Sequence, residues 1–233
     1  ENTSTRAGLN YNYRNTYKTN FSHMSYTFTK GRRDYIFNNV IDSIGQSTSE
    51  VEDYDSRNMN HQIFGGLGRL FSPIKTVLKA NINLSTGVSD YLLNNELAKQ
   101  KSIGISGSLE IINNFSTSVF GEYKVTYGNQ LNELAGDRKN KVIYNNHFLN
   151  LTIYPNDRNS VIIYNSFYIN NISSQSKQFF LDAMYRFRLE QWKTDIELSA
   201  TNILNNNQYL QQISNSYQIV QSFFELRPRQ FII

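Results

Sequence analysis

Three histidines are the residues in this 233-residue chain best suited to bind a metal or to transfer protons near neutral pH. His23, His61 and His147 lie far apart in the sequence, and no two of them have the spacing of a metal-binding motif. Cysteine is absent, and so are the GxSxG, HExxH and phosphate-binding loop patterns. The sequence therefore predicts no catalytic residue, no metal site and no cofactor, and a protein that is not an enzyme.

The run EVEDYD brings four carboxylates together, namely Glu50, Glu52, Asp53 and Asp55. Its spacing differs from that of an EF-hand loop, which needs ligands at fixed positions and a glycine at the turn. A surface calcium site or a contact with a cationic ligand is one interpretation. We favour a solvated external loop, in which the charges face water.

A second group of charged residues alternates with apolar ones in FFLDAMYRFRLE, residues 179–190. Successive side chains of a strand point to opposite faces, so Asp182, Arg186 and Arg188 share one face and the apolar side chains share the other. Glu225 belongs to the same pattern near the end of the chain. We predict that these four residues face an aqueous lumen, where charges can pair across strands. Ligand-binding residues cannot be singled out.

The same alternation recurs along the whole chain. KTVLKANINLS and KSIGISGSLE, for example, each separate an apolar face from one of Asn, Ser and Lys or Glu. About eleven strands of about ten residues or more are expected, as in transmembrane barrels. They span residues 5–14, 20–30, 59–71, 75–87, 100–111, 114–127, 141–154, 159–171, 177–190, 193–203 and 217–233.

The connections between these strands alternate in length. Short turns are expected at residues 15–20, 72–75, 112–114, 155–159 and 191–194. Long polar loops are expected at residues 31–58, 88–100, 128–140 and 203–217, with a shorter one near 171–177. Short periplasmic turns and long external loops are typical of outer-membrane barrels.

The composition narrows the class of protein. Tyr and Phe number 16 and 15, but hydrophobic residues total only 39%. The formal net charge of +4 is scattered and forms no basic stripe, which argues against nucleic-acid binding. No apolar run approaches the roughly 18 to 20 residues of a membrane-spanning helix. A soluble β-sandwich adhesin would also show alternation, but long strands and the tyrosines near their ends favour a membrane barrel with an aromatic girdle.

The C-terminal segment carries the most specific pattern. Asn202-Ile203-Leu204-Asn205, an Asn-rich loop and then Leu226-Arg227-Pro228-Arg229-Gln230-Phe231 resemble the end of TonB-dependent outer-membrane receptors, in particular the outer-membrane β-barrel family of the Bacteroidota. Leu204 stands where Phe is usual. The match covers roughly the last 35 residues. In it, Leu226, Arg227, Pro228, Arg229 and Phe231 form the C-terminal family motif.

This resemblance implies a fold and a location. Residues 1–233 would be a single domain, the C-terminal half of an antiparallel, plugged barrel of the 22-stranded class, with the plug and the N-terminal strands outside this sequence. The last strand is expected to pass Pro228 through a bulge, with Glu225, Arg227 and Arg229 facing the lumen. The location would be the outer membrane of a Gram-negative bacterium.

The resemblance also implies a function and partners. TonB-dependent uptake of a scarce or bulky solute, such as a siderophore, an oligosaccharide or a peptide, is the first hypothesis. A structural or accessory barrel of an envelope complex, without transport of its own, is the alternative. Expected partners are outer-membrane lipid, the barrel-assembly machinery and a TonB-type energy-coupling protein, with a surface lipoprotein or an envelope complex as a further candidate.

Overall fold

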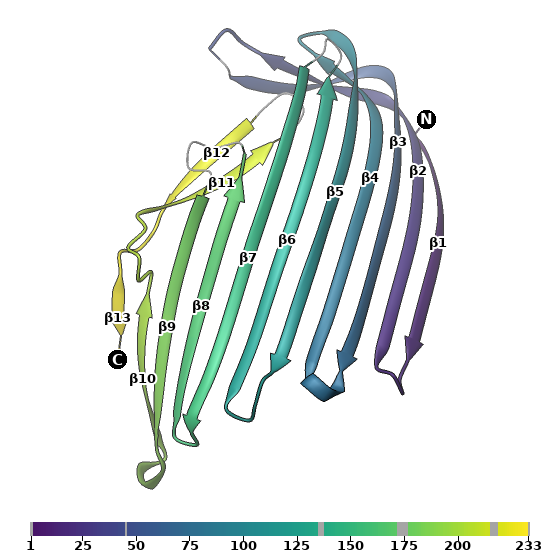
Figure 1. Ribbon diagram of the computed structural model, residues 1–233. Helices are drawn as coiled ribbons and strands as arrows, with labels where there is room; N and C mark the ends of the chain where they lie inside the picture. Colours follow the sequence, from purple (N-terminus) through teal and green to yellow (C-terminus); the bar gives the residue numbers. More distant parts are fainter. Residues whose placement is uncertain (1, 45, 135–137, 172–176, 215–218, 233) are drawn as a thin grey trace.

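The computed structural model describes residues 2–44, 46–134, 138–171, 177–214 and 219–232, and these form an all-β structure (Figure 1). In this part of the chain, eleven strands hydrogen-bond into one sheet in sequence order. They are β1 (Thr3–Asn15), β2 (Asn20–Ile41), β3 (Ser47–Phe71), β4 (Thr76–Leu93), β5 (Glu96–Asn114), β6 (Val119–Leu134), β7 (Arg138–Asn156), β8 (Asn159–Asn170), β9 (Lys177–Leu189), β10 (Thr194–Thr201) and β13 (Gln230–Ile232). A separate hairpin pairs β11 (Gln208–Ser214) with β12 (Ile219–Glu225).

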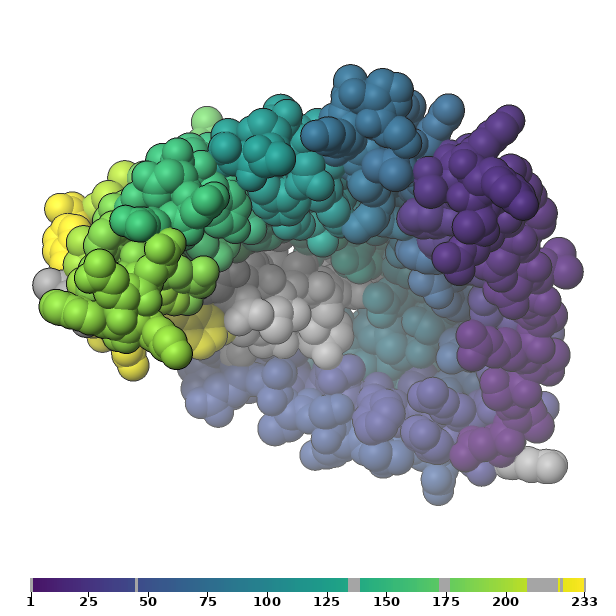
Figure 2. Space-filling view, turned by 90° about the horizontal axis from the view of Figure 1, so that it is seen from below, coloured from purple at the N-terminus to yellow at the C-terminus, as the bar shows by residue number. Residues whose placement is uncertain are grey.

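The sheet confirms the prediction of an all-β antiparallel fold with about eleven strands. Consecutive strands in this order are antiparallel, and β2 and β4 add a short parallel pairing at Asn38 and Asn39. The two edges are β1 and β13, so the sheet is open, as fits part of a barrel. Seen along the strands, the molecule curves around a hollow (Figure 2). Two single-turn 3₁₀ helices, η1 (Ser72–Ile74) and η2 (Glu190–Trp192), close the β3–β4 and β9–β10 turns.

The register confirms that the apolar residues of different strands share one face. Leu84 of β4 lies opposite Ile105 of β5, and Ala183 of β9 lies opposite both Ile163 of β8 and Ala200 of β10. We call this side the apolar face and the opposite side the polar face. A strand pairing shifted by one residue would have mixed the two sets.

Side chains crowd more closely on the polar face than on the apolar face, where the tightest contact of an added Cβ atom is 3.0 Å, from Gly121 to the ring of Phe115. On the polar face, a Cβ atom at Gly68 or Gly128 would overlap the ring of Phe21 or Tyr144 on the neighbouring strand. On the apolar face, a Cβ atom at Gly65 would make an ordinary contact of 3.5 Å. Side chains converge on the concave side of a curved sheet, so this crowding indicates that the polar face is the inner one.

Little of the molecule is buried. Among the described residues, Ile36, Tyr91 and Leu92 are the only buried large hydrophobic side chains. The apolar face is instead open, with Leu9 of β1 75% exposed and side chains such as Ile82 and Ile105 about half exposed. A soluble chain of this length would bury a much larger core.

The three long loops expected at residues 31–58, 88–100 and 128–140 are corrected by the structure. β2 and β3 continue as a paired hairpin up to Ile41 and Ser47, and β4 and β5 meet at a two-residue turn, Asn94-Asn95. Both turn residues have positive φ, 51° and 66°, which is the type I′ geometry that asparagine tolerates. The sequence did not predict these strand extensions because polar side chains lie on both of their faces. A hairpin that extends beyond the apolar band of the sheet needs no apolar face.

The opposite end of the sheet carries the short turns, as expected. Four of these turns present a large apolar side chain, at Tyr17, Ile74, Phe115 and Trp192, and each is at least 63% exposed. Two strands separate Tyr17 from Ile74 and Ile74 from Phe115, and four strands separate Phe115 from Trp192, so the residues recur along one rim of the sheet. We call this set the short-turn rim.

Candidate functional site

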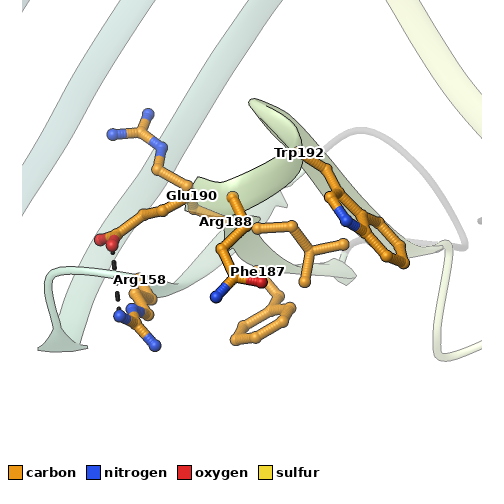
Figure 3. Close-up of a pocket in the computed structure, with 7 residues that line it drawn as sticks. Arg158, Phe187, Arg188, Glu190 and Trp192 are labelled. Atoms are coloured by element: carbon orange, nitrogen blue, oxygen red, sulfur yellow. Dashed lines mark hydrogen bonds and ion pairs between the residues drawn. The ribbon is translucent and has the colours of Figure 1, made fainter.

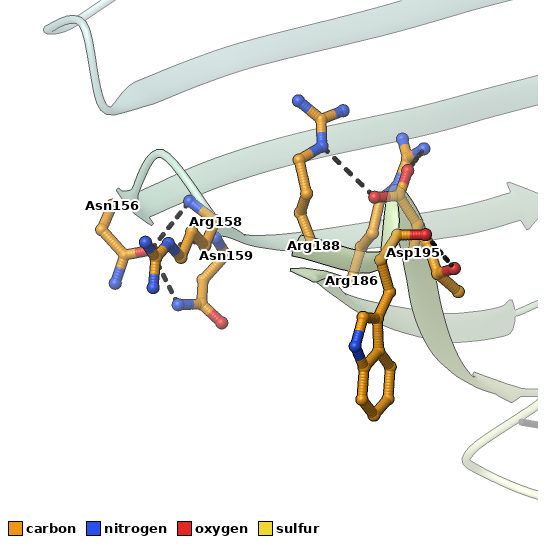
Figure 4. A network of polar contacts seen from close by, with 8 residues as sticks. Asn156, Arg158, Asn159, Arg186, Arg188 and Asp195 are labelled. Atoms are coloured by element: carbon orange, nitrogen blue, oxygen red, sulfur yellow. Dashed lines mark hydrogen bonds and ion pairs between the residues drawn. The ribbon is translucent and has the colours of Figure 1, made fainter. Parts of the chain in front are cut away.

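Charged residues of the polar face gather where β9 meets β10. The register places Asp182, Arg186 and Arg188 on this face, opposite Tyr164, Ser160 and Asp195. Arg186 forms an ion pair with Asp195, and Nε of Arg188 donates to Oδ1 of Asp195 at 3.2 Å (Figure 4). One carboxylate therefore holds two guanidinium groups. That these residues line a lumen stays a prediction.

Asp182 has a different partner. Its Oδ1 atom accepts a hydrogen bond of 2.7 Å from the backbone N–H of Asn202, the first residue after β10. Asn202 has a φ of 51°, a left-handed conformation in which asparagine is tolerated better than most residues. Asp182 thus fixes the point at which the chain leaves the sheet.

Asparagines connect the two parts of the C-terminal motif. Nδ2 of Asn202 donates to the carbonyl oxygens of Asn206 (2.8 Å) and Arg227 (2.9 Å). Oδ1 of Asn202 accepts from the N–H of Asn206 at 2.9 Å, and Oδ1 of Asn205 accepts from the N–H of Arg229 at 3.1 Å. Segments that are about 25 residues apart in the sequence therefore form one hydrogen-bonded unit, which we call the asparagine junction.

The single last strand expected at residues 217–233 is wrong. β12 ends at Glu225 and pairs with β11, residues 226–229 lie outside any strand, and β13 pairs with β10. Glu225 is therefore not on the eleven-stranded sheet, and the alternation that put it on one face with Arg227 and Arg229 does not apply. Pro228 has no N–H to donate to a strand partner, which favours the break.

The remaining motif residues are held mainly through the backbone. The N–H of Leu226 donates to the carbonyl of Asn207 at 2.9 Å, and the Arg227 and Arg229 side chains are exposed. Phe231 lies opposite Ala200 on the apolar face and is 74% exposed. The motif thus returns the chain from the β11–β12 hairpin to the edge of the sheet.

A pocket of about 250 Å³ lies beside η2 on the short-turn rim (Figure 3). Arg158, from the β7–β8 turn, donates from Nη2 to Oε2 of Glu190 at 3.2 Å, and Trp192 forms another wall. The backbone N–H of Arg188 donates to the carbonyl of Arg158 at 2.8 Å, which fixes the two turns side by side. The sequence alone did not predict this pocket. Its one signal was the single tryptophan of the chain, which lies in the β9–β10 turn.

The acidic run is not in a loop. Glu50, Glu52, Asp53 and Asp55 lie within β3. Glu52 accepts from Nδ2 of Asn38 at 2.6 Å, and Asp55 forms an ion pair with Arg32 across the hairpin. Within the described ranges, no three His, Asp or Glu side chains are arranged to hold a metal ion.

Asn38 anchors the β2–β3 extension on the tip of the β4–β5 hairpin. Its side chain is 1% exposed, donates to Oδ1 of Asn95 and accepts from the N–H of Asn95 at 3.2 Å. Oδ1 of Asn94 accepts a further hydrogen bond of 2.7 Å from the N–H of Ile41. The end of the sheet opposite the short-turn rim is therefore held together by asparagine contacts.

The Arg32–Asp55 pair gives a pH prediction. The hydrogen bond from Arg32 lowers the pKa of Asp55, so the pair stabilises the hairpin fully above the ordinary carboxyl pKa of about 3.9. That stabilisation is lost as the pH falls through the lowered folded-state value. Hydrogen exchange of the residues 32–55 amides, corrected for intrinsic rates, should therefore lose protection below about pH 4.

Asp55→Asn should remove this pH dependence, because no carboxylate remains at the pair. Asp53→Asn, in the same acidic run, is the matched control and should keep it. Equal pH profiles for wild type and Asp55→Asn would exclude the pair as its cause.

The histidines do not meet. His23 is on the polar face, as expected, opposite Gly66. His61 and His147 are on the apolar face, and Nδ1 of each bonds a tyrosine hydroxyl, that of Tyr26 at 2.8 Å and that of Tyr123 at 2.6 Å. Each pair satisfies two polar groups on an otherwise apolar surface.

In the part of the chain that the structure describes, no helix has the length and apolar character needed to cross a membrane. Comparisons of the chain with protein-family models, with curated proteins and with solved structures gave no match.

Proposed function

We propose that the chain forms part of the wall of an outer-membrane β-barrel of the TonB-dependent-receptor type, which takes up a scarce or bulky solute. The observation that carries this proposal is the continuous, exposed apolar face, which runs across the strands of the sheet. Exposed apolar patches larger than a few hundred Å² are rare on soluble monomers and favour contact with another apolar phase. Lipid is a phase that can cover such a face over its full width.

The two ends of the sheet and its inner face support the same proposal. The short-turn rim carries exposed Tyr, Ile, Phe and Trp side chains, which suit the layer between lipid tails and water. The polar face carries amides, hydroxyls and ion pairs such as Lys79–Glu110, with Nζ and Oε1 2.6 Å apart. Such a face suits a wet or plugged lumen. The Tyr–His pairs reduce the cost of placing histidine on the lipid side.

The transport role rests on the C-terminal motif and its resemblance. Uptake would require energy from a TonB-type protein, insertion by the barrel-assembly machinery and capture of solute at the outer end, with or without a surface lipoprotein. The ordered β2–β3 extension and the β4–β5 tip offer a rigid platform for such capture.

Uptake measurements in a deletion strain test the proposal. Loss of accumulation of one solute among labelled siderophores, oligosaccharides and peptides is expected, with recovery on complementation and loss on adding a protonophore. Unchanged uptake of every solute, together with loss of a co-purifying envelope complex, would instead favour an accessory barrel without transport. Recovery of the protein from the soluble fraction as a monodisperse species would exclude both functions.

A further inference from the structure

The pocket beside η2 combines charged groups with an aromatic ring at the edge of the apolar face. Arg158 and Glu190 provide a guanidinium group and a carboxylate, whereas the side chain of Arg188 extends over the polar face to Asp195. Phe187 and Leu189 carry the apolar face of β9 up to the pocket. The other turns of the short-turn rim offer an apolar side chain, but this one adds paired charges of both signs.

The charges of the pocket can rearrange around a third group. The side chains of Arg158 and Glu190 are both more than half exposed, and their Nη2–Oε2 distance is 3.2 Å. Exposed ion pairs contribute little stability, so opening this one costs little. Arg158 bonds Glu190 through Nη2, which leaves further guanidinium donors for a ligand. In Figure 3 the carboxylate of Glu190 points toward Arg158, while Trp192 lies on the other side of the turn.

We propose that this pocket binds the headgroup of an aminophospholipid. The phosphodiester accepts hydrogen bonds from the guanidinium group of Arg158, and the ammonium group pairs with Glu190. Trp192, 75% exposed, lies at the boundary where its ring contacts lipid and its N–H faces the headgroups. Phe187 and Leu189 contact the first part of the acyl chains. The inference rests on the proposed function, because the sheet must span a membrane to bring this rim to the headgroup layer.

Phosphate and ammonium groups together select this lipid class. Guanidinium groups match phosphate oxygens in geometry, whereas a carboxylate beside them repels an additional negative charge. A headgroup with an exposed primary amine satisfies both signs, whereas choline cannot donate a hydrogen bond to Glu190. A purely anionic headgroup leaves Glu190 unpaired.

The single tryptophan makes the site directly observable. The protein is reconstituted into phosphatidylcholine vesicles that contain acyl-brominated lipid with an ethanolamine, glycerol or choline headgroup, and quenching of Trp192 fluorescence is measured. The ethanolamine lipid should associate about two- to fivefold more strongly than the choline lipid, the range expected of one exposed ion pair. Equal quenching by all three lipids would overturn the proposal and leave the barrel itself standing.

Two variants and one control sharpen the test. Arg158→Ala should abolish the preference for ethanolamine, whereas Glu190→Gln should shift it to the anionic glycerol headgroup. Lys18→Ala removes a positive charge from the turn that carries Tyr17 and should change nothing. An unchanged ethanolamine preference in Arg158→Ala would overturn the assignment of the pocket.

Addition of inorganic phosphate distinguishes a lipid ligand from a soluble phosphorylated ligand. Inorganic phosphate added to the protein in detergent should leave Trp192 fluorescence unchanged, and in vesicles it should leave the ethanolamine preference intact. Displacement of the lipid by phosphate would identify a soluble phosphorylated ligand and overturn the lipid assignment. Absence of quenching by any brominated lipid would show that the rim never reaches lipid, and the proposed function would fail with the inference.

Discussion

Leu181→Arg is expected to destabilise folding into a lipid bilayer by about 2 to 4 kcal/mol, the cost of a charged residue on the lipid face near the midplane. Leu181 is in the central part of β9, and its partner Asn165 on β8 is on the same apolar face. Its described neighbours on this face of β8, Asn165, Ile163 and Phe167, carry no carboxylate, so the guanidinium would enter lipid without a partner. Denaturant titration of protein refolded into vesicles measures the change in free energy of unfolding.

The matched control is Arg186→Ala on the polar face of the same strand. It breaks the pair with Asp195, in which both side chains are partly exposed, and should cost less than about 1 kcal/mol. The opposite ranking, with Arg186→Ala the more damaging change, would mean that the polar face and not the apolar face meets the lipid.

The alternation of residues predicted the fold where one face has to be apolar. In β9 every second residue from Phe179 to Leu189 is apolar, and the structure places all of them on one face. The same rule failed for residues 31–58 because the β2–β3 extension is held by backbone pairing and by groups such as Asn38, without an apolar face. The Asn94-Asn95 pair, which lies between Leu92-Leu93 and Glu96-Leu97, could have indicated the turn from the sequence, since asparagine adopts positive φ at low cost.

The site was harder to predict than the fold because it depends on register. Asp195 and Arg188 could be assigned to alternating stretches from the sequence, but their contact follows from the four-residue turn that sets them opposite each other. The pocket at η2 joins two turns, and Arg158 is about 30 residues from Trp192. Alternation within one strand carries no information on such contacts.

The C-terminal motif also depends on contacts that alternation within one strand cannot predict. Its residues were recognisable as a pattern, but alternation assigned Glu225, Arg227 and Arg229 to one strand. A local rule cannot anticipate that Asn202 and Asn205 hold the backbone of residues 226–229 from a distance. The pattern reflects backbone capture by amide side chains, which also explains why asparagines recur in the preceding loop.

Asn202→Ala is expected to release β13 from the sheet. The substitution removes two donated hydrogen bonds and one accepted bond, each contributing about 0.5 to 1.5 kcal/mol, and places alanine at a φ of 51°, which costs about 1 to 2 kcal/mol more. The expected local loss of stability is about 2 to 4 kcal/mol, because these contributions are not fully additive. Hydrogen exchange at the amides of Leu226 and Arg229 should accelerate accordingly.

Two neighbouring substitutions separate the side-chain bonds from the backbone conformation. Asn202→Asp keeps an acceptor for the N–H of Asn206 and tolerates positive φ, but it loses both donated bonds. The exchange rates at Leu226 and Arg229 in this variant should therefore lie between those of wild type and of Asn202→Ala. Asn207→Ala leaves intact the backbone carbonyl that receives the N–H of Leu226, and should change stability by less than about 0.5 kcal/mol. If Asn202→Ala leaves Leu226 and Arg229 as protected as in wild type, the β10–β13 pairing alone holds the C-terminal strand, and the asparagine junction has no role in placing it.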